Sequence, residues 1–203
     1  MMTKPLDPKR TLLLVALEKE LPKKLLPTWN IYYTGVGKVN AALSVVAAFN
    51  LYKPNVIINY GTVGSLNPKL SGLIKVNKFF QRDMDVRPLG FEYGETPFDK
   101  VNTISLDYEG FSCGTGDNFA VEKQIIQSDV VDMESYSIAK FCYINKIKFI
   151  CYKYITDNAD ENSPENWNLN IEKGTKLFTK TLNDLIWLWV KLHKDLVTVS
   201  YTH

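Results

Sequence analysis

The sequence predicts an α/β fold with three layers, in which helices cover both faces of a central, mixed but mainly parallel, twisted sheet. Short apolar runs of strand length alternate along the chain with segments of helical period. The strand-like runs are apolar throughout, which is typical of strands that are buried on both faces. The length of 203 residues suits one domain, so we expect a single domain over residues 1–203.

The first half of the chain predicts several strands around one helix. Residues 11–16 form an unbroken apolar run, and residues 31–34 form a second short strand. The segment 39–51 is rich in small residues and is expected to be helical. Pro54 then interrupts the pattern before a further buried strand at 56–59. Two more β-like segments follow at residues 73–80 and 103–106.

The second half predicts two helices around one strand. Apolar residues recur with a helical period from 132 to 145. Residues 148–155 return to β-branched and aromatic side chains and predict a strand. Residues 172–194 carry one apolar stripe and predict a final helix, which leaves residues 160–170 as a mobile loop.

The composition argues against several classes of function. Lys and Arg number 24 against 22 Asp and Glu, so the charge gives no reason to expect a nucleic-acid partner. The three cysteines are dispersed and match neither a zinc site nor a redox pair. Residues 35–40 hold only the front half of a dinucleotide fingerprint and no P-loop. We therefore expect neither a metal nor a nucleotide cofactor. Since the N-terminus is polar and charges break the last apolar stretch, we also expect no signal segment and no membrane span. The dispersed, odd-numbered cysteines favour a reduced protein in the cytoplasm.

Carboxylates are the candidate acid–base groups, because the chain has only two histidines, His193 and His203. In parallel sheets, ligands bind beyond the carboxyl ends of the strands. Polar residues follow three predicted strands there, namely Glu18 and Glu20, the glycine-bearing turn 61–65 with Thr62, and Asp157. Asp132 and Glu134 open a predicted helix.

Each of these groups also has a purely structural interpretation. Acids at a helix start compensate the helix dipole, a Gly-rich segment makes a tight turn, and Asp caps helices. What favours a shared site is that Glu20, Thr62, Glu134 and Asp157 all fall at element boundaries where such a sheet gathers its ligand.

Six segments, in order, resemble the methylthioadenosine/S-adenosylhomocysteine nucleosidases, a family of the nucleoside phosphorylase superfamily. The segments are residues 34–39, 58–64, 83–86 with 90–94, 116–119, 132–135 and 155–160. The resemblance implies a nucleoside phosphorylase-like fold and hydrolysis of a 5′-modified adenine nucleoside by water, without a cofactor. By this resemblance Asp157 is the general acid that protonates the purine, and Glu20 is the base that activates the attacking water.

The resemblance also implies residues that bind the substrate. Glu134 would hold the ribose hydroxyls, and Met133 would pack under the sugar. Phe119 would stack on the base, whose edge the backbone of Phe119 and Ala120 would read. Thr62 would help to orient the catalytic acid. The remaining expected residues would reach across a homodimer interface to line the 5′-substituent pocket: Leu89, Phe91 and Pro97.

Departures from the family pattern leave the substrate open. The segments 98–113 and 120–131 are short, the first without an evident helix, while Leu17 and Asp132 replace the usual Met and Glu. A phosphate-dependent phosphorylase would need cations beside the ribose, for which Lys38 and Arg82 are candidates. A futalosine-type hydrolase would also suit the short chain, and a catalytically silent nucleoside-binding module is a hypothesis of a different class.

Overall fold

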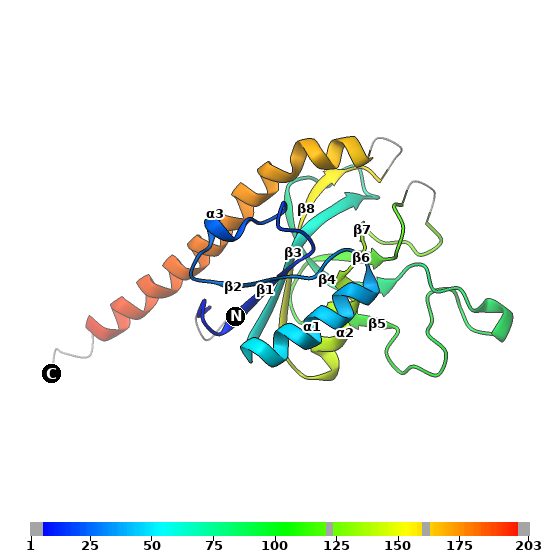
Figure 1. Ribbon diagram of the computed structural model, residues 1–203, viewed down its shortest axis with the longest axis horizontal. Helices are drawn as coiled ribbons and strands as arrows, with labels where there is room; N and C mark the ends of the chain where they lie inside the picture. Colours follow the sequence, from blue (N-terminus) through cyan, green and yellow to red (C-terminus); the bar gives the residue numbers. More distant parts are fainter. Residues whose placement is uncertain (1–5, 121–123, 160–162, 199–203) are drawn as a thin grey trace.

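The computed structural model describes residues 6–120, 124–159 and 163–198, with only the backbone at 163–166, 168–169 and 187–198 (Figure 1). His193 and His203 therefore lie outside the described side chains. The strands are β1 Thr11–Val15, β2 Asn30–Tyr33, β3 Val56–Ser65, β4 Leu73–Gln81, β5 Thr103–Ser105, β6 Phe111–Thr115, β7 Val130–Asp132 and β8 Lys148–Asp157. The helices are α1 Lys38–Tyr52, α2 Ser135–Ile144 and α3 Ser163–Thr198, with short 3-10 turns η1 Lys23–Leu25 and η2 Arg87–Leu89.

The strands form one eight-stranded mixed sheet in the order β2-β1-β3-β7-β6-β4-β5, and β8 pairs with both β3 and β4. Parallel pairings join β1 to β2 and β3, β3 to β8, and β6 to β4 and β7. Antiparallel pairings join β3 to β7, and β4 to β5 and β8. The mainly parallel sheet expected from the sequence is confirmed, and β8 curls it by linking β3 back to β4.

Helices cover both faces of the sheet, as predicted, with α3 on one side and α1 and α2 on the other (Figure 1). Strand β1 explains the arrangement, since all five of its residues are buried. Its Leu12 and Leu14 join the core under α1 and α2, whereas Leu13 and Val15 join the core under α3. Alternate side chains of a strand point to opposite faces, so burial of both faces requires an unbroken apolar run.

The predicted turn at residues 61–65 is wrong, because β3 continues to Ser65. A bulge lies between Val63 and Gly64 in the pairing with β8. Glycines in a strand mark bulges or places where another group approaches closely. A Cβ on Gly61 would lie 3.2 Å from the Lys153 Nζ, and one on Gly64 would lie 2.8 Å from the Asp157 Oδ1. The glycines therefore make room for side chains instead of turning the chain.

The predicted loop over residues 160–170 is also wrong where it can be compared, because α3 begins at Ser163. Residues 160–162 lie outside the described residues. The stretch has few apolar residues and no helical period, but a Pro just inside a helix start is favourable. Similarly, Asp132 ends β7 and α2 begins only at Ser135, so Asp132 is not a helix residue.

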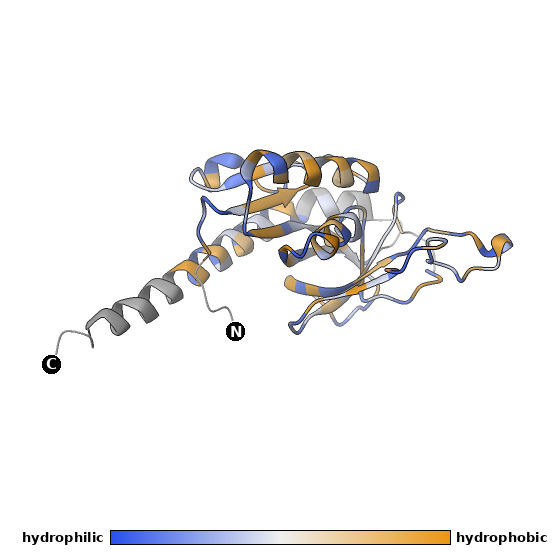
Figure 2. Cartoon of the chain, turned by 90° about the horizontal axis from the view of Figure 1, so that it is seen from below, coloured by the Kyte–Doolittle hydropathy of each residue, from blue (hydrophilic) through white to orange (hydrophobic). Residues whose placement is uncertain are grey.

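The segment between β4 and β5, residues 82–102, projects from the body as an arm (Figure 1). Its tip is coloured as hydrophobic in Figure 2. Phe98, which is 94% exposed, and Leu89, which is 70% exposed, belong to this arm. Within the part of the chain that the structure describes, no helix combines the length and apolarity needed to cross a bilayer.

Candidate active site

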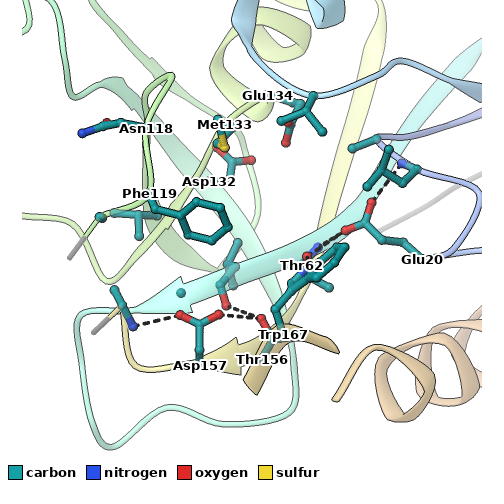
Figure 3. A pocket seen from close by; sticks show the side chains of 18 of the residues that line it. Glu20, Thr62, Asn118, Phe119, Asp132, Met133, Glu134, Thr156, Asp157 and Trp167 are labelled. Carbon is teal, nitrogen blue, oxygen red and sulfur yellow. Dashed lines mark hydrogen bonds between the residues drawn. The ribbon is translucent and has the colours of Figure 1, made fainter. Parts of the chain in front are cut away.

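A cavity of about 250 Å³ lies at the carboxyl ends of β1, β3 and β8 (Figure 3). These strands are parallel, so residues that follow them meet at one edge of the sheet. Arg82, one of the two candidate phosphate ligands, lines this cavity, and so do seven of the expected catalytic and substrate-binding residues: Glu20, Thr62, Phe119, Ala120, Met133, Glu134 and Asp157. Figure 3 shows Asp157 and Phe119 on one side of it, and Glu20 and Glu134 on the other.

Glu20 is buried and accepts three hydrogen bonds. The Leu17 N–H donates to Oε2 at 3.1 Å, and the Thr62 N–H and hydroxyl donate to Oε1 at 3.0 and 2.7 Å. Burial raises the pKa of Glu20, while these donors and the Lys153 ammonium oppose the rise. Residues 17–21 form turns and no helix, so the helix-dipole interpretation of Glu20 does not hold. The three donors stabilise the carboxylate, which is the form that a general base requires, against the effect of burial.

Asp157, at the end of β8, accepts a hydrogen bond from the Thr156 hydroxyl on Oδ2 at 2.8 Å and one from the Ala159 N–H on Oδ1 at 2.9 Å. It does not cap a helix, since α3 begins at Ser163. The hydroxyl group that donates to the Asp157 carboxylate is therefore that of Thr156. The expected partner, Thr62, bonds to Glu20 instead, so its expected role in orienting the acid is corrected to a role at Glu20.

Glu134 accepts a hydrogen bond from the Gly37 N–H at 2.9 Å and is 8% exposed. Burial, and then the nearby Asp132 carboxylate, raise the pKa of Glu134 to about 8. Near neutrality it therefore carries a proton and can donate a hydrogen bond as well as accept one. Such a group suits the hydroxyls of a sugar.

A buried ion pair supports this wall of the cavity. The Lys153 Nζ lies 2.8 Å from the Asp132 Oδ2, and each side chain is 1% exposed. Asp132 also accepts hydrogen bonds from the Thr115 hydroxyl at 2.6 Å and the Ser135 N–H at 3.0 Å. Although burial works against it, the Lys153 ammonium holds the pKa of Asp132 below its usual range. Because Asp132 and Glu20 both lie near Lys153, one cation stabilises two buried carboxylates.

The two candidate phosphate ligands are bound to acceptors of the chain itself. The Lys38 Nζ pairs with the Asp83 Oδ1 at 2.5 Å and bonds the Gln81 Oε1 at 3.1 Å. The Arg82 guanidinium donates to the side chains of Asn118 and Gln124 and to the carbonyls of Gly116 and Asn118.

The start of α1, which could bind an anion, is also occupied. The Gly37 N–H bonds Glu134, and the Lys38 N–H donates to the Asp117 Oδ1 at 2.7 Å. Carboxyl groups of the chain therefore satisfy the Gly37 and Lys38 amides at this helix start.

Leu89, Phe91 and Pro97 lie on the arm and do not line the cavity of their own chain. The Phe91 ring packs edge-on against Phe98 with centroids 5.4 Å apart. Their expected role at a partner's pocket remains a prediction.

Among the residues whose part in the site was not expected from the sequence are Lys153, Trp167 and Gly64, the last of which was expected only as part of a turn. A Lys within an otherwise apolar strand was the available signal for Lys153, since buried charges are almost always paired. Trp167 falls in the segment taken as a loop, and it lines the cavity. Gly64 permits Asp157 to lie against β3, because a Cβ there would meet its Oδ1 at 2.8 Å and the Ala159 Cβ at 3.0 Å.

The fold and the cavity define the class of protein. The family model of the Phosphorylase superfamily matches residues 28–110 and 108–187, so the chain belongs to this superfamily. A 5′-methylthioadenosine/S-adenosylhomocysteine nucleosidase from Buchnera aphidicola subsp. Acyrthosiphon pisum is 32% identical over 185 residues, covering 75% of this chain and 80% of the relative. One from Staphylococcus aureus is 27% identical over 182 residues, covering 77% and 80%. Within the superfamily, the chain belongs to the 5′-methylthioadenosine/S-adenosylhomocysteine nucleosidase family.

Solved structures share the fold. A futalosine hydrolase mutant of Helicobacter pylori superposes with a TM-score of 0.78 at 18% identity, covering 87% of this chain and 97% of that one. The H. pylori 5′-methylthioadenosine/S-adenosyl homocysteine nucleosidase gives a TM-score of 0.77 at 19% identity with the same coverage. The fold alone therefore does not separate these two activities.

Proposed function

We propose that this protein is a nucleosidase that hydrolyses the N-glycosidic bond of 5′-methylthioadenosine and S-adenosylhomocysteine. The observation that carries the proposal is the convergence of Glu20, Glu134 and Asp157 on one cavity, with Asp157 on the side of Phe119 and Glu20 on the side of Glu134 (Figure 3). The relatives in sequence favour these substrates over futalosine, since those at 31–32% identity are named for them.

In the proposed mechanism, Asp157 donates a proton to the purine while the ribose gains oxocarbenium character. Phe119, which is 54% exposed, stacks on the base, and Ala120 contributes backbone groups. Glu134 binds the ribose hydroxyls above Met133. Glu20 accepts the proton of the attacking water on the ribose side. Bond cleavage and water addition together give free base and a 5′-substituted ribose.

Water rather than phosphate is the proposed nucleophile. Arg82 and Lys38 are bound to acceptors of the chain, and carboxylates occupy the amides at the start of α1. Asp157 and Glu20 together argue against a silent binding module. A binder has no use for an acid on the side of the purine together with a second acid on the ribose side that accepts three hydrogen bonds.

We propose further that the protein is a homodimer in the cytoplasm. Val39, Leu43 and Val46 share one face of α1 and are 69%, 68% and 46% exposed, which is unusual for apolar residues at this spacing. A second copy that covers this face could insert Leu89, Phe91 and Pro97 of its arm beside the 5′ position of the substrate. The three cysteines are free and buried, which suits a reducing compartment.

The test is chromatography of purified protein incubated with methylthioadenosine, S-adenosylhomocysteine, futalosine, adenosine and inosine, with and without phosphate. We expect adenine from the first two without phosphate, and no acceleration when phosphate is added. Release that requires phosphate would make the protein a phosphorylase. Fastest cleavage of futalosine would reassign the substrate, and no release from any nucleoside would favour the binding module.

A further inference from the structure

Trp167 on α3 forms a hydrogen bond with the Thr62 hydroxyl, which in turn contacts Glu20, the candidate general base. Its indole Nε1–H donates to the Thr62 Oγ1 at 2.7 Å, and its ring lines the cavity (Figure 3). An indole N–H can only donate, so the Thr62 oxygen must be the acceptor.

The contact fixes the direction of the next hydrogen bond. A hydroxyl has one proton, and when its oxygen accepts from Trp167 that proton is free to point elsewhere. The Thr62 Oγ1 lies 2.7 Å from the Glu20 Oε1, so its proton is donated to the carboxylate. The result is a one-way chain from the indole through the hydroxyl to Glu20. Since successive hydrogen bonds polarise one another, the Thr62 donor is stronger than it would be alone.

The register of α3 places Trp167 for this contact. Trp167, Ile171, Gly174 and Phe178 recur at helical spacing, and the last three are buried against the sheet. Gly174 lets the helix pack tightly, since a Cβ there would lie 2.6 Å from the Tyr154 Cγ.

Helix α3 also contacts the backbone of Glu20, the candidate general base. The Thr175 hydroxyl donates to the Glu20 carbonyl at 2.7 Å, while the Asn170 side chain donates to the Thr156 carbonyl at 3.0 Å. The Lys19 ammonium lies 5.1 Å from the centre of the Trp167 ring. Helix α3 therefore contacts the main-chain carbonyl of Glu20 directly through Thr175, and it reaches the Glu20 carboxylate indirectly, from Trp167 through the Thr62 hydroxyl.

We propose that Trp167 is a positioning residue, which orients the Thr62 hydroxyl so that Glu20 is fixed and kept in its basic form for attack by water. The proposal rests on the proposed role of Glu20 as general base. In this proposal the indole N–H orients Thr62, while the indole ring separately forms part of the cavity wall.

The test compares Trp167→Phe, Thr62→Val and the double variant with the wild type, by kcat, KM and the pH profile of kcat/KM for methylthioadenosine. Phe keeps an aromatic wall but lacks the N–H. We expect Trp167→Phe to lower kcat about five- to tenfold, as for one hydrogen bond, with KM changed less than about twofold. The acidic limb of the profile should move to higher pH. In the Thr62→Val background, the Phe substitution should lower kcat no further.

Thr62→Ser is the matched control, because it keeps the hydroxyl and should keep the effect of Trp167→Phe. An unchanged kcat in Trp167→Phe, a change in KM alone, or an equal loss of kcat in both backgrounds would overturn the proposal. If Trp167→Phe does not fold, near-equal kcat values for Thr62→Val and Thr62→Ser would overturn it too. Should the wild type release no adenine, or Glu20→Gln keep full turnover, the proposed function fails and this inference with it.

Discussion

At the scale of residues, surroundings assign different tasks to acids of similar chemistry. Burial raises the pKa of Glu20, and the three hydrogen bonds that it accepts oppose the rise by stabilising the carboxylate. Glu134 is buried with one such bond and beside Asp132, which favours the protonated form. Asp157 lies on the side of Phe119 with one hydroxyl and one amide as partners. Different environments thus separate a candidate base, a candidate sugar-binding group and a candidate acid.

Replacing the candidate acid tests its role. Asp157→Asn keeps the size and the acceptor oxygen but removes the acidic proton. We expect kcat for methylthioadenosine to fall by about 10²–10⁴-fold, as for loss of a general acid, while binding of the substrate changes little. Steady-state kinetics with a separate binding titration check this. Asp107→Asn, at an exposed position, is the control and should keep full activity.

The pKa of Glu134 predicts a dependence of stability on pH. Its folded pKa of about 8 exceeds its ordinary value of 4.5, so between these values the folded protein holds a proton that the unfolded chain releases. The stabilisation is complete below the unfolded pKa and is lost as the pH rises through the folded pKa. The loss is at most about 1.4 kcal/mol per pH unit.

Glu134→Gln lacks this proton but keeps an acceptor for the Gly37 N–H. Its Tm relative to the wild type should therefore rise steadily when both are unfolded by heat at pH 5, 6, 7 and 8. A difference that stays constant over this range would contradict the raised pKa.

At the scale of elements, the prediction of the fold succeeded where a pattern is local and failed where tertiary contacts decide. Strand β1 was predictable because burial on both faces demands an unbroken apolar run. Strands β6 and β7 were not predicted, since short strands that contain Cys, Gly and Asp show no period. Gly61 and Gly64 indicated a turn, but they make room for Lys153 and Asp157. These two residues belong to β8, which pairs with β3 but is distant from it in the sequence.

The candidate site followed the same division. Residues after the parallel strands could be predicted to meet, because their ends share one edge of the sheet. Trp167 could not be found in this way, since the start of α3 has no helical period and is fixed by contacts with β8 and with Thr62. The sequence also could not show that Thr62 contacts Glu20 instead of Asp157, because tertiary structure decides which carboxylate lies within reach of its hydroxyl.

Helix α3 packs closely on β8 where Gly174 faces Tyr154. In Gly174→Ala the new methyl group would overlap Tyr154, so the helix must move outward. Overpacking of this kind costs about 1–3 kcal/mol. We expect a lower Tm together with a lower kcat, because Trp167 and Thr175 move with the helix. Thermal unfolding and kinetics check both effects. Lys176→Ala, at an exposed position of α3, should change neither.

At the scale of the whole molecule, the sheet and its three described helices bury two cores, and the prediction of one domain over residues 1–203 stays a prediction. Among the described side chains, α1 and the arm each carry exposed apolar residues: Val39, Leu43, Val46 and Leu51 on α1, and Leu89 and Phe98 on the arm. Both features have one explanation if a second copy covers α1 and completes the 5′ side of the cavity.

This explanation predicts a dimer that one charge disrupts. Leu43→Asp would bury a carboxylate in the interface, so the variant should sediment as a monomer while the wild type sediments as a dimer. Its KM for methylthioadenosine should rise, because the partner's arm no longer covers the 5′ group. Leu177→Asp, an exposed apolar position on α3, is the control and should stay dimeric. A wild type that is fully active as a monomer would contradict the prediction.

The central claim is that water, activated by Glu20, attacks the ribose while Asp157 protonates the base. The most direct measurement is mass spectrometry of the sugar released from methylthioadenosine in phosphate-free water labelled with heavy oxygen. We expect free adenine and methylthioribose with one heavy oxygen atom, and loss of this product in Glu20→Gln and in Asp157→Asn. Product that forms only when phosphate is supplied, or labelled product that persists in both variants, would contradict it.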